Sequence, residues 1–122
     1  MSANILTVDD SASIRLTTRV ALSNAGYQIT EAVDGLDGIA KLNGGHFDLI
    51  VTDLNMPNMD GLTMIRELRK MPAHMGVPVI FLTTESDGEI KQQAKAAGAT
   101  GWLTKPFDPE SLVKIVRKVL GR

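Results

Sequence analysis

Polar residues suited to phosphoryl chemistry follow four apolar runs of this chain. They are Asp9 and Asp10 after residues 5–8, Asp53 after 49–52, Thr83 after 79–82, and Lys105 after 102–104. If these runs are parallel strands of one sheet, all five side chains emerge at the same edge. That edge, outside the carboxyl ends of the strands, is where open α/β folds bind ligands. We therefore expect these residues to form one site.

The residue types at this edge indicate a hard cation and a phosphoryl group. Crowded carboxylates repel one another, which favours uptake of a proton or a cation. Oxygen ligands with open positions suit Mg²⁺, which keeps waters and accepts phosphate oxygens. An aspartate can itself attack phosphorus, provided that a metal, a fixed positive charge such as Lys105 and a hydroxyl such as Thr83 stabilise the phosphoryl oxygens. Asp53 is the better nucleophile because it ends a central apolar run as a single acid, whereas the pair Asp9–Asp10 suits metal binding.

Length and composition predict one globular domain spanning residues 1–122. A hydrophobic content of 43% is ordinary for a folded protein, and no apolar stretch approaches the roughly 20 residues that cross a bilayer. The amino terminus does not resemble a signal peptide, and zero cysteines fit a reducing compartment, so we expect a cytoplasmic protein. A net charge of −1 without a basic stripe argues against nucleic acid as a partner. We expect no effector module after the last helix.

Strand-like and helix-like patterns alternate five times along the chain. We expect strands near 4–8, 28–32, 48–53, 78–83 and 101–104, and helices near 12–25, 35–43, 61–70, 87–97 and 109–120. The third and fourth strands are apolar in succession rather than alternating, which marks strands covered on both faces of a parallel sheet. Asp108 and Pro109 suit the start of the last helix. The glycines expected to end helices in a left-handed conformation are Gly26, Gly44, Gly98 and Gly121.

Two further features each leave two interpretations open. The fourth helix has a thin apolar stripe (Ile90, Ala94 and Ala97), which fits either a surface that switches or a merely exposed helix. Trp102 is either a functional aromatic or a plain aromatic covering the sheet edge. The two histidines lie in loop-like segments without cysteine or acidic neighbours at ligand spacing, and we expect both to lie on the surface; they are His46 and His74.

Four segments of the chain together resemble the receiver domain of two-component response regulators. They are residues 8–10, 53–61, 81–85 and 102–107, which occur in the family's order and spacing over the whole chain. The similarity is greatest to the single-domain chemotaxis type, CheY. The resemblance implies a flavodoxin-like, doubly wound (βα)₅ fold with a five-stranded parallel sheet of order 2-1-3-4-5 and helices on both faces.

The resemblance also implies roles for individual residues. Asp53 would accept a phosphoryl group from a histidine kinase, and Asp10 and Asp53 would ligate Mg²⁺ with the backbone carbonyl of Asn55. Asp9 would act on the metal through water. Lys105 would pair with Asp53 and then with the phosphoryl group.

The same resemblance describes how phosphorylation would be transmitted. Thr83 would bond the phosphoryl oxygen, and Trp102 stands where the family usually places a Tyr or Phe that rotates inward. The surface of the fourth helix, fifth strand and fifth helix would then bind a flagellar motor switch protein, a phosphatase or another target of this monomeric domain. The Lys105–Pro106 bond is cis in the family. Trp102 is larger than the usual aromatic, and Thr84 stands where Ala or Gly is common.

We therefore expect a phosphorylation-activated signalling switch, in chemotaxis, rather than an enzyme. One alternative is a phosphate sink or relay intermediate without a dedicated output partner. Another is an aspartate-nucleophile phosphohydrolase, which would need a second acid two residues after the nucleophile, where this chain has Asn55. A hydrolase would also need a substrate cap, for which the chain has no residues to spare.

Overall fold

Five parallel strands form a single sheet in the order β2-β1-β3-β4-β5. The computed structural model describes residues 3–84 and 88–121, with only the backbone for 88–90. The strands are β1 Asn4–Val8, β2 Gln28–Ala32, β3 Leu49–Asp53, β4 Val79–Thr83 and β5 Gly101–Thr104. The predicted fold class and strand order are confirmed, and the carboxyl ends of all five strands lie at one edge of the sheet.

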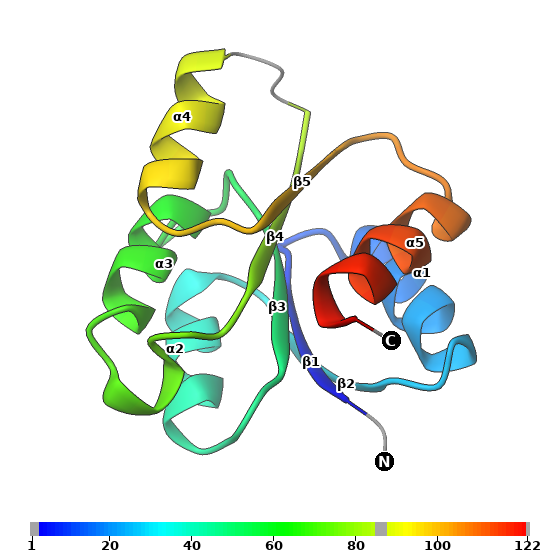
Figure 1. Cartoon of the computed structure of the whole chain (residues 1–122), viewed down its shortest axis with the longest axis horizontal. Coiled ribbons are helices and arrows are strands. Elements are labelled where there is room, and N and C mark those ends of the chain that lie inside the picture. Colours follow the sequence, from blue (N-terminus) through cyan, green and yellow to red (C-terminus); the bar gives the residue numbers. More distant parts are fainter. Residues whose placement is uncertain (1–2, 85–87, 122) are drawn as a thin grey trace.

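Helices cover both faces of this sheet, as the doubly apolar central strands predict. They are α1 Ala12–Asn24, α2 Gly35–Asn43, α3 Gly61–Leu68, α4 Gly88–Ala96 and α5 Pro109–Leu120. Figure 1 shows α1 and α5 on one side of the sheet and α2, α3 and α4 on the other. No helix among these described residues is long and apolar enough to span a membrane.

Alternate residues of each strand feed two separate cores. Leu6, Ile50 and Phe81 pack with Met64 and Leu68 beneath α2, α3 and α4. The opposite core lies beneath α1 and α5, and its members include Ile5, Val51, Ile80, Leu22, Leu112 and Val116. Every residue of β3 and β4 is buried, so both strands are fixed from two sides. The polar groups at their carboxyl ends are therefore held on a rigid base.

Most helix ends follow their predicted local signals. The carboxylate of Asp108 accepts the Ser111 amide at 2.7 Å, with Pro109 in the first turn of α5. Gly26, Gly98 and Gly121 have φ values of 98°, 103° and 74°. The left-handed conformation predicted for Gly44 is wrong, because its φ is −107° and its amide closes a tight turn onto the last residues of α2.

Predicted boundaries differ from the structure by one or two residues. The predicted strands 48–53 and 78–83 each begin one residue later, and α1 and α3 end one and two residues earlier than expected. The predicted fourth helix, 87–97, is observed as Gly88–Ala96, and residue 87 lies outside the described residues. Ala94 of its thin stripe is buried, whereas the side chain of Ile90 also lies outside them.

The surface position predicted for His74 is wrong. His74 ends a short 3₁₀ helix (Pro72–His74) and is only 4% exposed, and its Nε2 lies 2.8 Å from the carbonyl oxygen of Leu42. This contact gives the Leu42 carbonyl, at the carboxyl end of α2, a side-chain donor in addition to the Gly45 amide at 3.4 Å. The side chain of His46 is 79% exposed, as predicted, although Asp48 lies 3.7 Å away.

Arg69 connects three segments at the edge of the sheet opposite the carboxyl ends. Its Nη1 donates to the carbonyls of Met75 at 2.8 Å and Val77 at 2.7 Å, and its Nη2 donates to the carbonyl of Gly98 at 2.8 Å. Burial lowers the pKa of this guanidinium. The turn after α4 is thereby tied to the loop before β4.

Two loops at this opposite edge leave room around their glycines. A Cβ built on Gly44 or on Gly76 would meet no heavy atom within 4 Å. Both glycines precede strands, Gly44 before β3 and Gly76 before β4. These loops lie away from the carboxyl ends of the strands.

Candidate functional site

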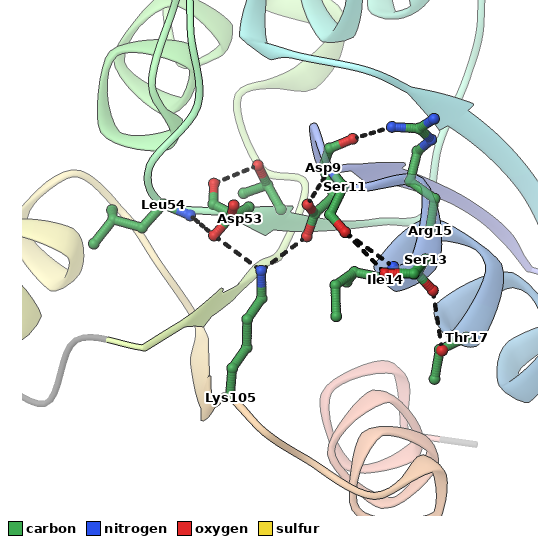
Figure 2. A network of polar contacts seen from close by, with 10 residues as sticks. Asp9, Ser11, Ser13, Ile14, Arg15, Thr17, Asp53, Leu54 and Lys105 are labelled. Carbon is green, nitrogen blue, oxygen red and sulfur yellow. Dashed lines mark hydrogen bonds and ion pairs between the residues drawn. The ribbon is translucent and has the colours of Figure 1, made fainter.

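Lys105 joins two carboxylates at the carboxyl ends of the central strands. Its Nζ lies 3.0 Å from Oδ2 of Asp9, which follows β1, and 3.3 Å from Oδ1 of Asp53, which ends β3. Figure 2 shows the ammonium between the two carboxylates. β1 and β3 are neighbours with Val8 opposite Thr52, so the strand register brings the two acids together.

Asp10 completes a cluster of three acids. One carboxylate oxygen from each of Asp9, Asp10 and Asp53 lies within 4.8 Å of the others. Asp9 and Asp53 are buried, whereas Asp10 is exposed and reaches the cluster from the solvent side. Three converging carboxylates with access to solvent fit a hard, oxygen-preferring cation such as Mg²⁺, which retains water ligands.

The surroundings of Asp53 oppose its negative charge. Burial raises the pKa of this carboxyl, and the neighbouring Asp9 raises it further, while Lys105 acts in the opposite direction. The Leu54 amide also donates to Oδ1 at 2.8 Å. A cation bound beside these acids would relieve the repulsion and favour the ionised, nucleophilic form of Asp53.

The turn after β1 is held by a capped helix and by an arginine. Oδ1 of Asp9 accepts the Ser11 amide at 2.9 Å, and Ser11 caps α1 by accepting the Ile14 amide at 3.3 Å. Arg15 donates to the main-chain carbonyl of Asp9 at 2.6 Å (Figure 2) and lies 3.8 Å from Glu31 on β2. Sequence reasoning missed Arg15, although a basic residue one helical turn after a helix cap is positioned to face that turn.

Gly61 lets α3 begin against the end of β3. A Cβ at this position would lie 2.5 Å from the Asp53 carbonyl oxygen and 2.7 Å from Cε1 of Phe81. The Gly61 amide donates to the Leu54 carbonyl at 2.9 Å. The helix start and the candidate nucleophile are therefore packed backbone to backbone.

Thr83 occupies the carboxyl end of β4, next to this cluster in the sheet. It is 1% exposed, and its carbonyl accepts the Lys105 amide at 2.7 Å. The Lys105–Pro106 peptide bond is cis, as the resemblance implied. The segment that carries the lysine is thus fastened to the strand that carries the threonine.

Trp102 lies on β5 and points into a different region from the acids. Its ring makes an edge-to-face contact with Phe81 (centroids 5.9 Å apart), and Nζ of Lys91 lies 5.6 Å from its centroid. The indole Nε1 is buried, with no hydrogen-bond partner among the described residues. The ring borders a groove of about 510 Å³ that extends along β5 to the start of α5.

The structure thus brings Asp9, Asp10, Asp53 and Lys105 into direct contact range and places Thr83 at the adjoining strand end. Asn55 is exposed in the loop after β3, and the role of its carbonyl stays a prediction.

Comparison with known proteins agrees with this geometry. The model of the response regulator receiver domain matches residues 5–117. The structure is similar to that of the chemotaxis response regulator CheY4 of Vibrio cholerae (44% identity, TM-score 0.94, covering 98% of this chain and 99% of that one). It is also similar to the receiver domain of a sensor histidine kinase from Pseudomonas aeruginosa PAO1, solved with a magnesium ion coordinated in its active-site cleft (27% identity, TM-score 0.91, covering 100% of both chains).

Among curated proteins, the chemotaxis protein CheV3 of Helicobacter pylori is 37% identical over 128 residues, covering 97% of this chain and 41% of that protein. The chain spans about half the length of the curated relatives it matches. The similarity to these relatives therefore concerns one domain of each.

Proposed function

This chain belongs to the response regulator receiver domain family, and on that premise we propose that it is a phosphorylation-controlled switch whose phosphoacceptor is Asp53. The observation that carries the proposal is the buried Asp53 carboxylate, which lies 3.3 Å from the Lys105 ammonium and within the cluster of three acids. A receiver domain is a signalling module of two-component systems, which distinguishes this chain from a phosphohydrolase.

The residues around Asp53 have separate roles in phosphoryl transfer. Asp10, Asp53 and the backbone carbonyl of Asn55 would hold Mg²⁺, with Asp9 acting through water. The bound ion supplies charge neutralisation of the phosphoryl oxygens. Lys105 already bonds Oδ1 of Asp53 and is placed to follow the phosphoryl group.

The chemical step is a displacement at phosphorus. Oδ2 of Asp53 attacks the phosphorus atom of a kinase phosphohistidine, the P–N bond breaks, and its electron pair stays on the imidazole nitrogen, which is then protonated. The product is an acyl phosphate on Asp53. The Thr83 hydroxyl then donates to a phosphoryl oxygen, which draws the carboxyl end of β4 towards the site.

A chemotaxis kinase is the partner that the comparisons favour, because both CheY4 and CheV3 are chemotaxis proteins. We place the output surface at the groove beside Trp102, where a flagellar motor switch protein, a phosphatase or another target would bind. Phosphorylation changes the charge at Asp53 and biases the position of this surface. A chain that is phosphorylated but gains affinity for none of these targets would instead be a phosphate sink.

Labelling by acetyl phosphate tests the phosphoacceptor. With Mg²⁺ present, intact-protein mass spectrometry should show the addition of one phosphoryl group to the wild type and none to Asp53→Asn. Asp48→Asn is the matched control, because Asp48 precedes β3 at the opposite edge of the sheet, where it accepts the Asn4 amide at 2.8 Å and an asparagine oxygen can accept the same bond. Failure to label the wild type, or labelling of the Asp53→Asn variant, would exclude Asp53 as the phosphoacceptor.

Fluorescence of Trp102, the single tryptophan, tests the output surface. Its emission should change when the wild type receives Mg²⁺ and acetyl phosphate, and should change less in Asp53→Asn. No response in a protein shown to be labelled would contradict a switch role for Trp102.

A further inference from the structure

We propose that Asp34 and Asn58 act as a clamp that positions the β3–α3 loop (residues 54–60) for magnesium binding. This inference rests on the proposed function, because the loop carries Asn55, whose carbonyl is the proposed metal ligand. Nδ2 of Asn58 donates to Oδ2 of Asp34 at 2.7 Å. Both are positioning residues, since neither belongs to the acid cluster.

The two carboxylate oxygens of Asp34 accept different hydrogen bonds. Oδ1 caps α2 by accepting the Asp37 amide at 2.8 Å, while Oδ2 accepts the side chain of Asn58. The same two contacts lower the pKa of Asp34, with the Asp37 amide as the larger cause. The Asp34 side of the clamp is therefore an ionised carboxylate fixed to the start of α2. The helix cap sets the orientation in which this carboxylate faces Asn58.

The loop is shaped to reach this carboxylate. Asn58 has a φ of 69°, the left-handed conformation that asparagine and aspartate tolerate better than other residues with a side chain. The next residue, Met59, accepts the Gly35 amide at 3.2 Å through its carbonyl. A Cβ on Gly35 would collide with that carbonyl, so the loop lies directly against the first residue of α2.

The other end of the loop is tied to the candidate nucleophile. The Leu54 amide donates to Oδ1 of Asp53 at 2.8 Å, and the Leu54 carbonyl accepts the Gly61 amide at 2.9 Å. The loop is thus closed where it begins and ends, by the bond between Leu54 and Gly61, and is attached to α2 at Asn58. Because Asn55 lies between these two attachments, the position of its carbonyl depends on both.

An exchange of the two side chains tests the clamp. Asn58→Asp keeps the size and the left-handed tolerance but sets two carboxylates against each other. We expect Mg²⁺ to bind about three- to tenfold more weakly, at or below the low end of the losses seen when residues that support metal ligands are changed. Adding the second change, Asp34→Asn, restores a carboxylate–amide pair of reversed direction and the original net charge, and should restore wild-type affinity.

Two further variants separate the effect of the lost hydrogen bond from the effects of added charge and of altered backbone conformation. Asn43→Asp adds the same charge at the far end of α2, where it touches neither clamp residue, and should not weaken binding. Asn58→Gly keeps the left-handed backbone while deleting the amide, and should also weaken binding about threefold or more. Mg²⁺ affinity is measured by calorimetry on the intact chain.

Hydrogen exchange in metal-free protein provides a readout independent of the metal. The Gly35 amide should exchange faster in Asn58→Asp than in the wild type and return to the wild-type rate in the double variant. Unchanged Mg²⁺ affinity in Asn58→Asp, or no recovery in the double variant, would overturn the clamp while leaving the proposed function intact. A wild type that fails to bind Mg²⁺ but shows the expected exchange pattern would instead overturn the metal site.

Discussion

Replacing Asp53 by asparagine should stabilise the metal-free protein, although it removes the contact to Lys105. At an effective dielectric constant of about 20, a charge pair at the 3.3 Å between Lys105 and Asp53 is worth about 5 kcal/mol of attraction. Asp9 and Asp10 both have an oxygen within 4.8 Å, and each repels Asp53 by about 3.5 kcal/mol or more on the same scale. Repulsion therefore exceeds attraction by about 2 kcal/mol, before the cost of burying the carboxylate.

Solvent around the exposed Asp10 weakens part of this repulsion, so we expect the free energy of unfolding to rise by about 1–2 kcal/mol in Asp53→Asn. The measurement is urea unfolding at pH 7 with EDTA, followed by Trp102 fluorescence. Repeating it with Mg²⁺ should stabilise the wild type by mass action and the variant less, because one metal ligand is gone. Glu67→Gln, a partly exposed acid on α3, should change stability by less than about 0.5 kcal/mol.

The difference in the free energy of unfolding between Asp53→Asn and the wild type should depend on pH, and the raised pKa fixes its sign. Because the folded state raises the pKa of Asp53, the folded protein binds a proton that the unfolded chain has already released. Wild-type stability in EDTA should therefore rise, relative to Asp53→Asn, as pH falls through the raised pKa towards the ordinary value of 3.8. An asparagine variant that is no more stable than the wild type at pH 7, or a difference that grows towards low pH, would refute this electrostatic account.

Three other substitutions test the packing of the fold, one beside the site and two at the opposite edge of the sheet. Gly61→Ala should lower the free energy of unfolding by about 1–3 kcal/mol, because its methyl group overlaps backbone and an aromatic ring, and an unchanged thermal midpoint would contradict that. Arg69→Met leaves several carbonyls without a donor and should cost about 3 kcal/mol in urea unfolding, whereas the exposed Arg66→Met on the same helix should cost less than about 0.5 kcal/mol. His74→Leu removes the donor to the end of α2 and should cost about 1–2 kcal/mol, and equal stability would show that contact to be dispensable.

The sheet and the acid cluster were predictable because their signals are local: each central strand is a short apolar run, and a polar residue follows it. Fully apolar runs such as those ending in Asp53 and Thr83 indicate strands covered on both faces, and parallel strands must share a carboxyl edge. That shared edge brings Lys105 close to Asp9, although the two residues are 96 positions apart in the sequence.

The residues that sequence reasoning missed act through contacts between distant segments. Arg69 resembles any basic residue at a helix end, and only the fold shows that the carbonyl of Gly98 lies opposite its guanidinium. His74 resembles a loop histidine until the end of α2 is seen to lie against it. The one local signal for the clamp is Asn58, because asparagine favours turns with a left-handed residue.

The open turn at Gly44 offers a place for protein engineering. It lies at the edge of the sheet away from the acids, and a Cβ added to Gly44 would meet no heavy atom within 4 Å. Extra length in a surface turn adds little closure entropy. A reporter introduced on the Gly44 side of this turn, away from Gly45, whose Cβ would lie 3.1 Å from the ring of Phe47, should therefore follow the behaviour of the domain without obstructing the approach of a phosphodonor.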